Sequence, residues 1–172
     1  MRNGKRKQVS NKLRGLSPEG GNVKIIIDTR EQTPWSFPLN VQTIPGTLQS
    51  GDYSISGLEE LISIERKSLE DLIGCCTGDG RNRFKRELLR LRSFRCKAVI
   101  IESSLQTILD GGHRSKINSE SVLGSITSWQ TRYGVPFVFA DSPENAARYC
   151  LATMRTFYNR CAEFAKQFNK EA

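Results

Sequence analysis

The stretch Gly51–Asp71 constrains the fold of this chain more than any other, because it places several charges around a short apolar strand. Side chains alternate between the two faces of a strand. In the expected strand Leu61–Lys67 the isoleucines therefore share one face, while Glu65 and Lys67 share the other. Such charges are costly to bury unless they share a cation or a substrate. With Asp52 just upstream, the stretch predicts a binding site built on the sheet.

Short apolar runs elsewhere predict further strands, and apolar residues at helical spacing predict helices. The expected strands are Val23–Asp28, Val41–Leu48 with an interruption at Pro45-Gly46, Gly51–Ile55, Leu61–Lys67, Lys97–Glu102 and Val135–Ala140, and the expected helices are Arg81–Arg95, Ser104–Leu109, Asn118–Tyr133 and Ser142 to about Phe168. Several strands come first and strand–helix alternation follows. This order indicates an α/β fold with a mixed central sheet flanked by helices.

Local signals add detail to this outline. Ser68 is expected to cap a helix whose first turn contains Asp71, where the helix dipole favours an anion. Gly134 suits the position just after the end of the expected helix Asn118–Tyr133. Residues 78–80, Gly-Asp-Gly, are expected to form a loop. Trp35 and Trp129 are expected to pack in the core, although stacking on a base or a place at a subunit interface are alternatives for them.

The net charge of the chain, +8, is unevenly spread. Residues 1–22 carry six Lys or Arg and one acid, and they show no apolar periodicity. We expect a disordered basic tail there, either a solvated leader or an arm that contacts phosphates. A positive field suits a polyanionic partner, but charge alone does not separate DNA from RNA or from an acidic protein.

Composition also excludes several classes of protein. The apolar runs are too short to span a bilayer, and the basic N-terminus lacks the apolar segment of a secretory signal. We therefore expect no membrane partner and an intracellular protein, in the cytoplasm of a bacterial or phage-infected cell or in a nucleus. Five cysteines without a C-x-x-C pair, and one histidine, argue against a zinc site. The thiols are expected to be reduced and mostly buried, with Cys75 and Cys76 the candidates for exposure.

The carboxylates of the opening stretch suit phosphodiester hydrolysis. Mg²⁺ neutralises phosphate charge and activates water when one or two carboxylates hold it. Asp52 and Glu65 are the obvious pair of ligands, and Asp28, at the end of a neighbouring strand, is a candidate third. Lys67 is suited to orient water and to stabilise the developing negative charge. The pattern is weak by itself, because an edge strand can carry the same residues as surface charges.

Four motifs in order make the pattern specific. They are Ile27-Asp28-Thr29-Arg30-Glu31, Gly51-Asp52, Glu65-Arg66-Lys67-Ser68-Leu69-Glu70-Asp71 and Asp79-Gly80-Arg81. In this respect residues 23–140 resemble the XPF-type structure-specific endonucleases, a branch of the PD-(D/E)XK nucleases that includes the XPF, MUS and archaeal Hef proteins. The resemblance implies a restriction-endonuclease-like fold, with residues 23–172 as the nuclease domain.

The resemblance also implies roles for particular residues. Asp52, Glu65 and Asp28 would surround Mg²⁺, for which Mn²⁺ would substitute, and Lys67 would be the catalytic lysine. Arg30, Glu31, Arg66 and Asp71 would support the site. DNA would be contacted by Arg81, Arg83, Lys85 and Arg86. The implied activity is metal-dependent cleavage of one DNA strand near a branch or flap in repair or recombination.

The chain also departs from the family pattern. No paired G-x-G hairpins follow Ala140, so the tandem helix-hairpin-helix module of many members is not expected here. A homodimer or a partner subunit is expected, because nuclease domains of this family pair. A catalytically silent DNA-binding or scaffold subunit is the alternative function. Retention of the motif carboxylates and of Lys67 favours an active enzyme.

Overall fold

A computed structural model describes residues 23–170 of the protein, and the side chains up to residue 167. The basic tail predicted for residues 1–22 lies outside these residues. Six strands form one sheet in the order β2-β1-β3-β4-β5-β6. The strands are β1 (Ile25–Asp28), β2 (Thr43–Gly46), β3 (Tyr53–Ile55), β4 (Ile62–Lys67), β5 (Cys96–Ile101) and β6 (Phe137–Phe139). The mixed α/β fold expected from the order of the elements is confirmed.

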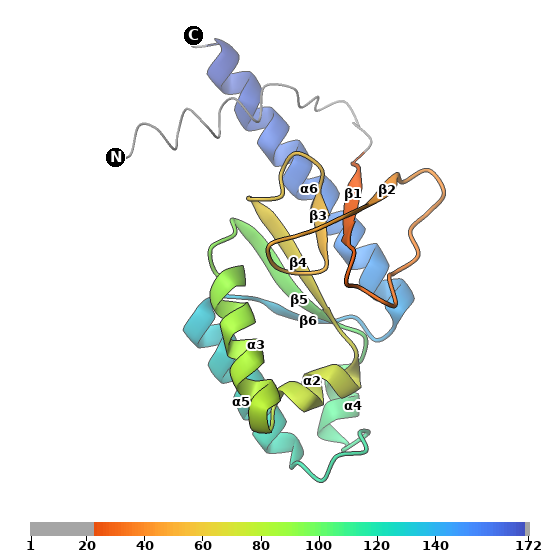
Figure 1. Cartoon of the computed structure of the whole chain (residues 1–172), viewed down its shortest axis with the longest axis vertical. Coiled ribbons are helices and arrows are strands. Elements are labelled where there is room, and N and C mark those ends of the chain that lie inside the picture. The colour runs from red at the N-terminus through yellow and green to blue at the C-terminus, as the bar shows by residue number, and fades with distance from the viewer. Residues whose placement is uncertain (1–22, 171–172) are drawn as a thin grey trace.

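Helices cover both faces of the sheet (Figure 1). They are α2 (Leu69–Cys75), α3 (Gly78–Leu91), α4 (Leu105–Leu109), α5 (Ser119–Tyr133) and α6 (Pro143–Lys170). The predicted caps are present: Ser68 accepts a hydrogen bond from Asp71 N, and Gly134 closes α5 with a φ of 62°. Most boundaries therefore lie within a few residues of those read from the sequence.

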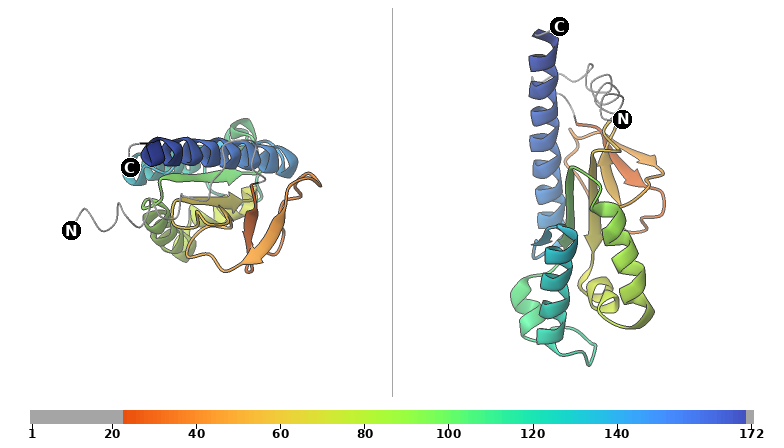
Figure 2. Two further views of the ribbon diagram at one scale, coloured as in Figure 1. Left: turned by 90° about the horizontal axis from the view of Figure 1, so that it is seen from above. Right: turned by 90° about the vertical axis from the view of Figure 1, so that its left-hand side faces the viewer.

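Alternation along β4 and β5 sorts the apolar side chains into two cores. Ile62, Ile64 and Ile100 face α6, whereas Val99 and Ile101 face the side of α2, α3, α4 and α5. Figure 2 shows α6 and α3 on opposite sides of the sheet, and α6 extending past the sheet toward the C-terminus. Among the described residues no helix is both long and apolar enough to cross a membrane.

The predicted interruption at Pro45-Gly46 is wrong, because both residues belong to β2. This strand lies at the edge of the sheet and pairs in parallel with β1 alone. Proline lacks an N–H group, and an edge strand tolerates this loss on its unpaired side. Gly46 lies close to the Ile26 side chain, since a Cβ atom there would come within 2.7 Å of Ile26 Cγ2.

The loop predicted at residues 78–80 is also wrong, because this segment is the first turn of α3. Asp79 in that turn is favoured by the helix dipole. Gly80 allows α3 to approach α2, since a Cβ atom at Gly80 would lie 2.3 Å from Gly74 O. The helix ends at Leu91 rather than at Arg95, as the chain turns into β5.

The expectations for the aromatic residues are confirmed, whereas that for two cysteines is wrong. Trp35 and Trp129 are buried, and Trp35 stacks on Tyr53 with ring centroids 4.5 Å apart. Cys75 and Cys76, the candidates for exposure, are buried between α2 and the core on that side. Burial raises the pKa of the Cys75 thiol to about 11, which keeps it protonated and unreactive at neutral pH.

The packing of α3 gives a stability prediction with a control on the same helix. Leu88 is fully buried, whereas its neighbour Leu89 is 57% exposed. Leu88→Ala should lower the free energy of unfolding by about 2–5 kcal/mol, because it removes buried methyl groups and leaves a cavity. Leu89→Ala should change it by less than about 1 kcal/mol. Urea denaturation followed by circular dichroism measures both, and equal losses would contradict the packing described.

Candidate active site

The predicted site residues meet at one edge of the sheet because of strand direction. β4 and β5 are parallel, and two antiparallel pairings make β1 run the same way as β4. Asp28 at the end of β1 and Glu65 near the end of β4 therefore reach the same edge. Asp52 precedes β3, which runs in the opposite direction, so it starts at that edge too. Backbone hydrogen bonds fix it there, from Asp28 N to Asp52 O and from Asp52 N to Ile64 O, both 2.8 Å.

Asp52 and Glu65 form a pair of neighbouring carboxylates, of which Glu65 is buried and Asp52 half-buried. Glu65 is only 2% exposed, and its Oε2 has no hydrogen-bond partner among the described residues. Asp52 Oδ2 accepts a hydrogen bond of 2.7 Å from Arg66 N. Burial is the largest influence on both: it raises the pKa of Asp52 to about 6 and that of Glu65 well above its ordinary value.

Lys67 balances part of this negative charge. Its Nζ forms an ion pair with Glu65 Oε1, as the shared strand face predicted, and lies 3.5 Å from Glu87 Oε2. It also lies 5.2 Å from the centroid of the Phe84 ring. Burial by itself lowers the pKa of Lys67, but the Glu65 and Glu87 carboxylates outweigh it and the net pKa is raised. Lys67 is therefore a fixed positive charge beside the carboxylate pair.

Glu87 was missed by sequence reasoning. It lies in α3, which is separated from β4 by a further helix, so no spacing rule connects it to Lys67. One signal was present in the sequence: Glu87 is the only acid between Arg81 and Arg95, among seven Lys and Arg residues. An isolated acid on a basic helix suggests a specific partner, but the sequence does not identify that partner.

Asp28 is held by its own neighbours. Its Oδ1 accepts hydrogen bonds from Arg30 N and Arg30 Nε at 2.9 and 2.7 Å. Its Oδ2 accepts from Arg30 Nη2 at 2.9 Å and from Leu48 N at 2.7 Å. Burial raises the pKa of Asp28, but these hydrogen bonds outweigh it, and the net pKa is lowered. The carboxylate anchors the loop after β1, and its role as a third metal ligand stays a prediction.

Arg66 connects the site to a buried carboxylate that was not singled out from the sequence. Its Nε and Nη2 donate to the two oxygens of Glu102 at 2.7 and 2.8 Å, and Glu31 lies 3.6 Å from its Nη1. Trp35 Nε1 also donates to Glu102. This network holds the Arg66 backbone, whose N–H binds Asp52, and it places Arg66 and Glu31 beside the site, where their supporting roles stay predictions.

The side chains of Asp71 and Arg81 form hydrogen bonds within the protein. Asp71 accepts from the Ser68 hydroxyl at 2.8 Å at the start of α2. Arg81 Nη1 donates to Ser125 Oγ at 2.7 Å and to Cys76 O at 3.2 Å, and its guanidinium lies 5.2 Å from the Trp129 ring. Arg81 thereby joins α3 to α5. Its contact with phosphate stays a prediction, as do those of Arg83, Lys85 and Arg86.

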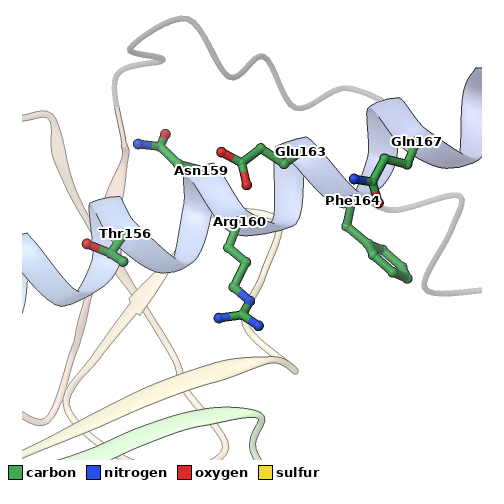
Figure 3. Close-up of a pocket in the computed structure, with 6 residues that line it drawn as sticks. All are labelled: Thr156, Asn159, Arg160, Glu163, Phe164 and Gln167. Carbon is green, nitrogen blue, oxygen red and sulfur yellow. The ribbon is translucent and has the colours of Figure 1, made fainter.

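The residues at the edge suit a divalent cation held by two carboxylates. Among the described residues no three His, Cys, Asp or Glu side chains are grouped closely enough to form a full set of metal ligands. Mg²⁺ does not need such a set, because it keeps several waters and uses one or two carboxylates. The unpartnered, buried Glu65 Oε2 beside Asp52 fits this requirement. A hollow of about 580 Å³ along α6 is separate from the site, since the described residues that line it all come from that helix (Figure 3).

The raised pKa of Asp52 predicts a pH-dependent cost to stability. A carboxyl group whose pKa is higher in the folded state stabilises the fold at low pH, and this contribution is lost as pH rises through about 6. In EDTA, Asp52→Asn should therefore be more stable than the wild type at pH 8, by up to about 3 kcal/mol. The advantage should shrink at pH 5. Thermal unfolding at the two pH values measures it.

Asp141→Asn is the matched control, because Asp141 is exposed and its φ of 64° is one that asparagine also tolerates. It should leave the melting temperature unchanged at both pH values. A melting temperature of Asp52→Asn at or below that of the wild type at pH 8 would contradict the pKa shift.

Comparison with known proteins agrees with this arrangement. XPF from Aeropyrum pernix in complex with DNA has a similar fold, with a TM-score of 0.62 and 23% identity over 78% of this chain and 64% of that one. The same protein without DNA matches with a TM-score of 0.62 and 23% identity, over 77% of this chain and 60% of the other. These likenesses confirm the XPF nuclease fold that the motifs implied.

A putative ATP-dependent RNA helicase of Methanocaldococcus jannaschii is 27% identical over 126 residues, which are 73% of this chain and 14% of the relative. The chain thus spans less than two thirds of the length of each relative. The family model of the ERCC4 domain matches residues 27–152, a range that takes in each motif residue from Asp28 to Arg81. This chain therefore belongs to the ERCC4 domain family.

Proposed function

We propose that this chain is a divalent-metal-dependent endodeoxyribonuclease that cleaves one strand of DNA near a branch or flap. The observation that carries the proposal is the buried Glu65 Oε2 without a partner, next to Asp52 and Lys67 at the edge of the sheet. Membership of the ERCC4 domain family and a fold shared with a protein that has been solved in complex with DNA support it. Repair or recombination is the setting that the resemblance implies.

The site residues would have different roles in the cleavage reaction. Asp52 and Glu65 would hold Mg²⁺ or Mn²⁺, and Asp28 keeps the loop after β1 in place. When bound, the metal would neutralise phosphate charge and lower the pKa of a bound water. Lys67, held as a cation by carboxylates, would orient the attacking water and stabilise charge on the phosphate oxygens. The water oxygen would bond to phosphorus as one P–O ester bond breaks; the water would lose a proton to solvent, and the sugar oxygen that leaves would take one up from solvent as a hydroxyl.

Substitutions at the site test the activity. Glu65→Gln and Lys67→Ala should each reduce the rate of cleavage of labelled flap, fork and four-way-junction DNA by at least about 100-fold, because each removes a charge that acts on the reacting phosphate. Cleavage by the wild type should require Mg²⁺ or Mn²⁺ and stop in EDTA. Linear duplex is the comparison substrate, and equal cleavage of duplex and branched DNA would reject the branch preference.

The alternative is a catalytically silent DNA-binding or scaffold subunit. The same assay separates it from an enzyme: a wild-type protein that binds these DNAs and cuts none of them, in either metal, would be such a subunit. The retained Asp52, Glu65 and Lys67 favour the enzyme. A homodimer or a partner subunit, proposed from the resemblance, would supply further DNA contacts in either case.

The side of α3 that lies next to the site is the proposed path of the DNA backbone. Arg83 and Arg90 lie one turn before and one turn after Glu87, so all three share one side of the helix. Glu87 contacts Lys67, which places this side next to the site. Both arginines are exposed, and no ion pair involves them among the described residues. Arg90 thus joins the arginines predicted to bind DNA.

Removing these two charges should weaken DNA binding. Arg83→Ala/Arg90→Ala should lower affinity for forked DNA roughly 10-fold at low salt, and should reduce the slope of log K against log [salt] by about 2, one for each lost phosphate contact. Fluorescence anisotropy at several KCl concentrations measures both. Arg155→Ala/Arg160→Ala removes two exposed charges from α6, on the opposite face of the sheet. An equal loss of affinity in this control would show that only net charge matters.

A further inference from the structure

Glu87 brings a third carboxylate to Lys67 from a different element of the fold. Lys67 and Glu65 belong to β4, whereas Glu87 belongs to α3. The Lys67 ammonium contacts both Glu65 Oε1 and Glu87 Oε2, and the Phe84 ring, also from α3, lies 5.2 Å away. Glu87 is outside the motifs that define the candidate site, so its position needs its own explanation.

The three side chains differ in how far solvent reaches them. The side chains of Glu65 and Lys67 are 3% and 14% exposed, whereas that of Glu87 is 25% exposed. Charges attract more strongly where water is excluded. Glu65 is the nearer of the two acids to Lys67, and without Glu87 it would be the only carboxylate paired with the ammonium among the described residues. With Glu87 present, the Lys67 ammonium is attracted by a second carboxylate on the α3 side as well as by Glu65.

The attraction of Lys67 to Glu87 affects which Glu65 oxygen is available to a metal ion. A metal ligand must offer an oxygen that is not occupied by a competing cation. Glu65 Oε1 binds Lys67, while Glu65 Oε2 has no hydrogen-bond partner among the described residues. The attraction of Glu87, which reaches Lys67 from α3, opposes a movement of the ammonium away from that helix and toward Glu65 Oε2.

We propose that Glu87 is a positioning residue that holds Lys67 toward α3 and so leaves Glu65 Oε2 open to a divalent cation. This inference rests on the proposed function, since it assigns a role within the same site. It also connects two parts of that function. The docking of α3, which presents Arg83 and Arg90 to DNA, then determines where Lys67 lies. The site is complete only when α3 is packed on the sheet.

Glu87→Gln tests the inference, because it removes the charge and keeps the size of the side chain. Calorimetric titration with Mn²⁺ should show about 10-fold weaker binding than in the wild type, the lower end of what loss of a residue that orients a metal ligand costs. In cleavage assays kcat should fall by a similar factor, while KM for DNA should stay unchanged. Glu87→Asp keeps the charge on a shorter side chain. Its Mn²⁺ affinity and its kcat should lie between those of the wild type and those of Glu87→Gln.

Two comparisons separate positioning from other effects. Glu163→Gln removes an exposed acid from α6 and should leave Mn²⁺ affinity unchanged. In a Lys67→Ala background, Glu87→Gln should cause no further loss of Mn²⁺ affinity, because the effect passes through Lys67. An equal loss with and without Lys67 would mean that Glu87 acts on the metal by its charge alone, and would overturn the inference.

The outcomes also separate this inference from the proposed function. A wild-type protein that binds Mn²⁺ but cleaves no DNA would reject the nuclease activity, and the Mn²⁺ titrations would still decide the role of Glu87. A wild-type protein that cleaves DNA, with Glu87→Gln equal to it in Mn²⁺ affinity and kcat, would reject the role of Glu87 alone. Thermal unfolding of Glu87→Gln confirms that it is folded, and Glu87→Asp provides the same test if it is not.

Discussion

The rest of the site depends on one constraint, the burial of the Glu65 carboxylate. A carboxylate with almost no contact with solvent is unfavourable unless a cation accompanies it. Lys67 supplies one, two residues along the same strand, yet one Glu65 oxygen remains without a partner among the described residues. This incomplete compensation destabilises the fold and favours the binding of a further cation. Binding sites of this kind commonly lower the stability of the fold, because the groups that bind a ligand are left without partners in its absence.

The topology of the sheet explains why the charges gather. Parallel β4 and β5 end at one edge, and two antiparallel steps bring the end of β1 and the start of β3 to the same place. Each site carboxylate thus lies at or near the end of a strand, where the backbone hydrogen bonding of the sheet stops. Around it, Asp28 with Arg30 and Arg66 with Glu102 tie the neighbouring backbone in place. Pairs of opposite charges therefore hold the backbone around the site in place.

The comparisons define what this chain shares with its relatives. The ERCC4 domain match and the XPF-like fold account for the sheet, the helices and the motif residues. The chain covers only part of each relative, 14% of the helicase and 64% of the XPF chain bound to DNA. Substrate choice therefore has to be argued from this chain's own surface, where Arg83 and Arg90 flank Glu87 on α3.

Much of the fold was readable from local pattern, because the signals lie within one element. Alternation along β4 placed Glu65 and Lys67 on one face, and Ser68 and Gly134 marked the ends of helices. The first turn of α3 was misread as a loop, since Gly78 and Gly80 are poor helix formers and the reason for Gly80 is its approach to Gly74 O.

The sequence by itself determined which residues are candidates for the chemistry and the order along the chain of the strands that present them. Only the tertiary structure decided which groups these residues contact in other elements. The contacts are Glu87 for Lys67, Glu102 for Arg66, Ser125 for Arg81 and Leu48 N for Asp28. The physical reason is that a period of two or 3.6 residues relates neighbours within an element. Contacts between elements depend instead on how the packed cores set the helices against the sheet.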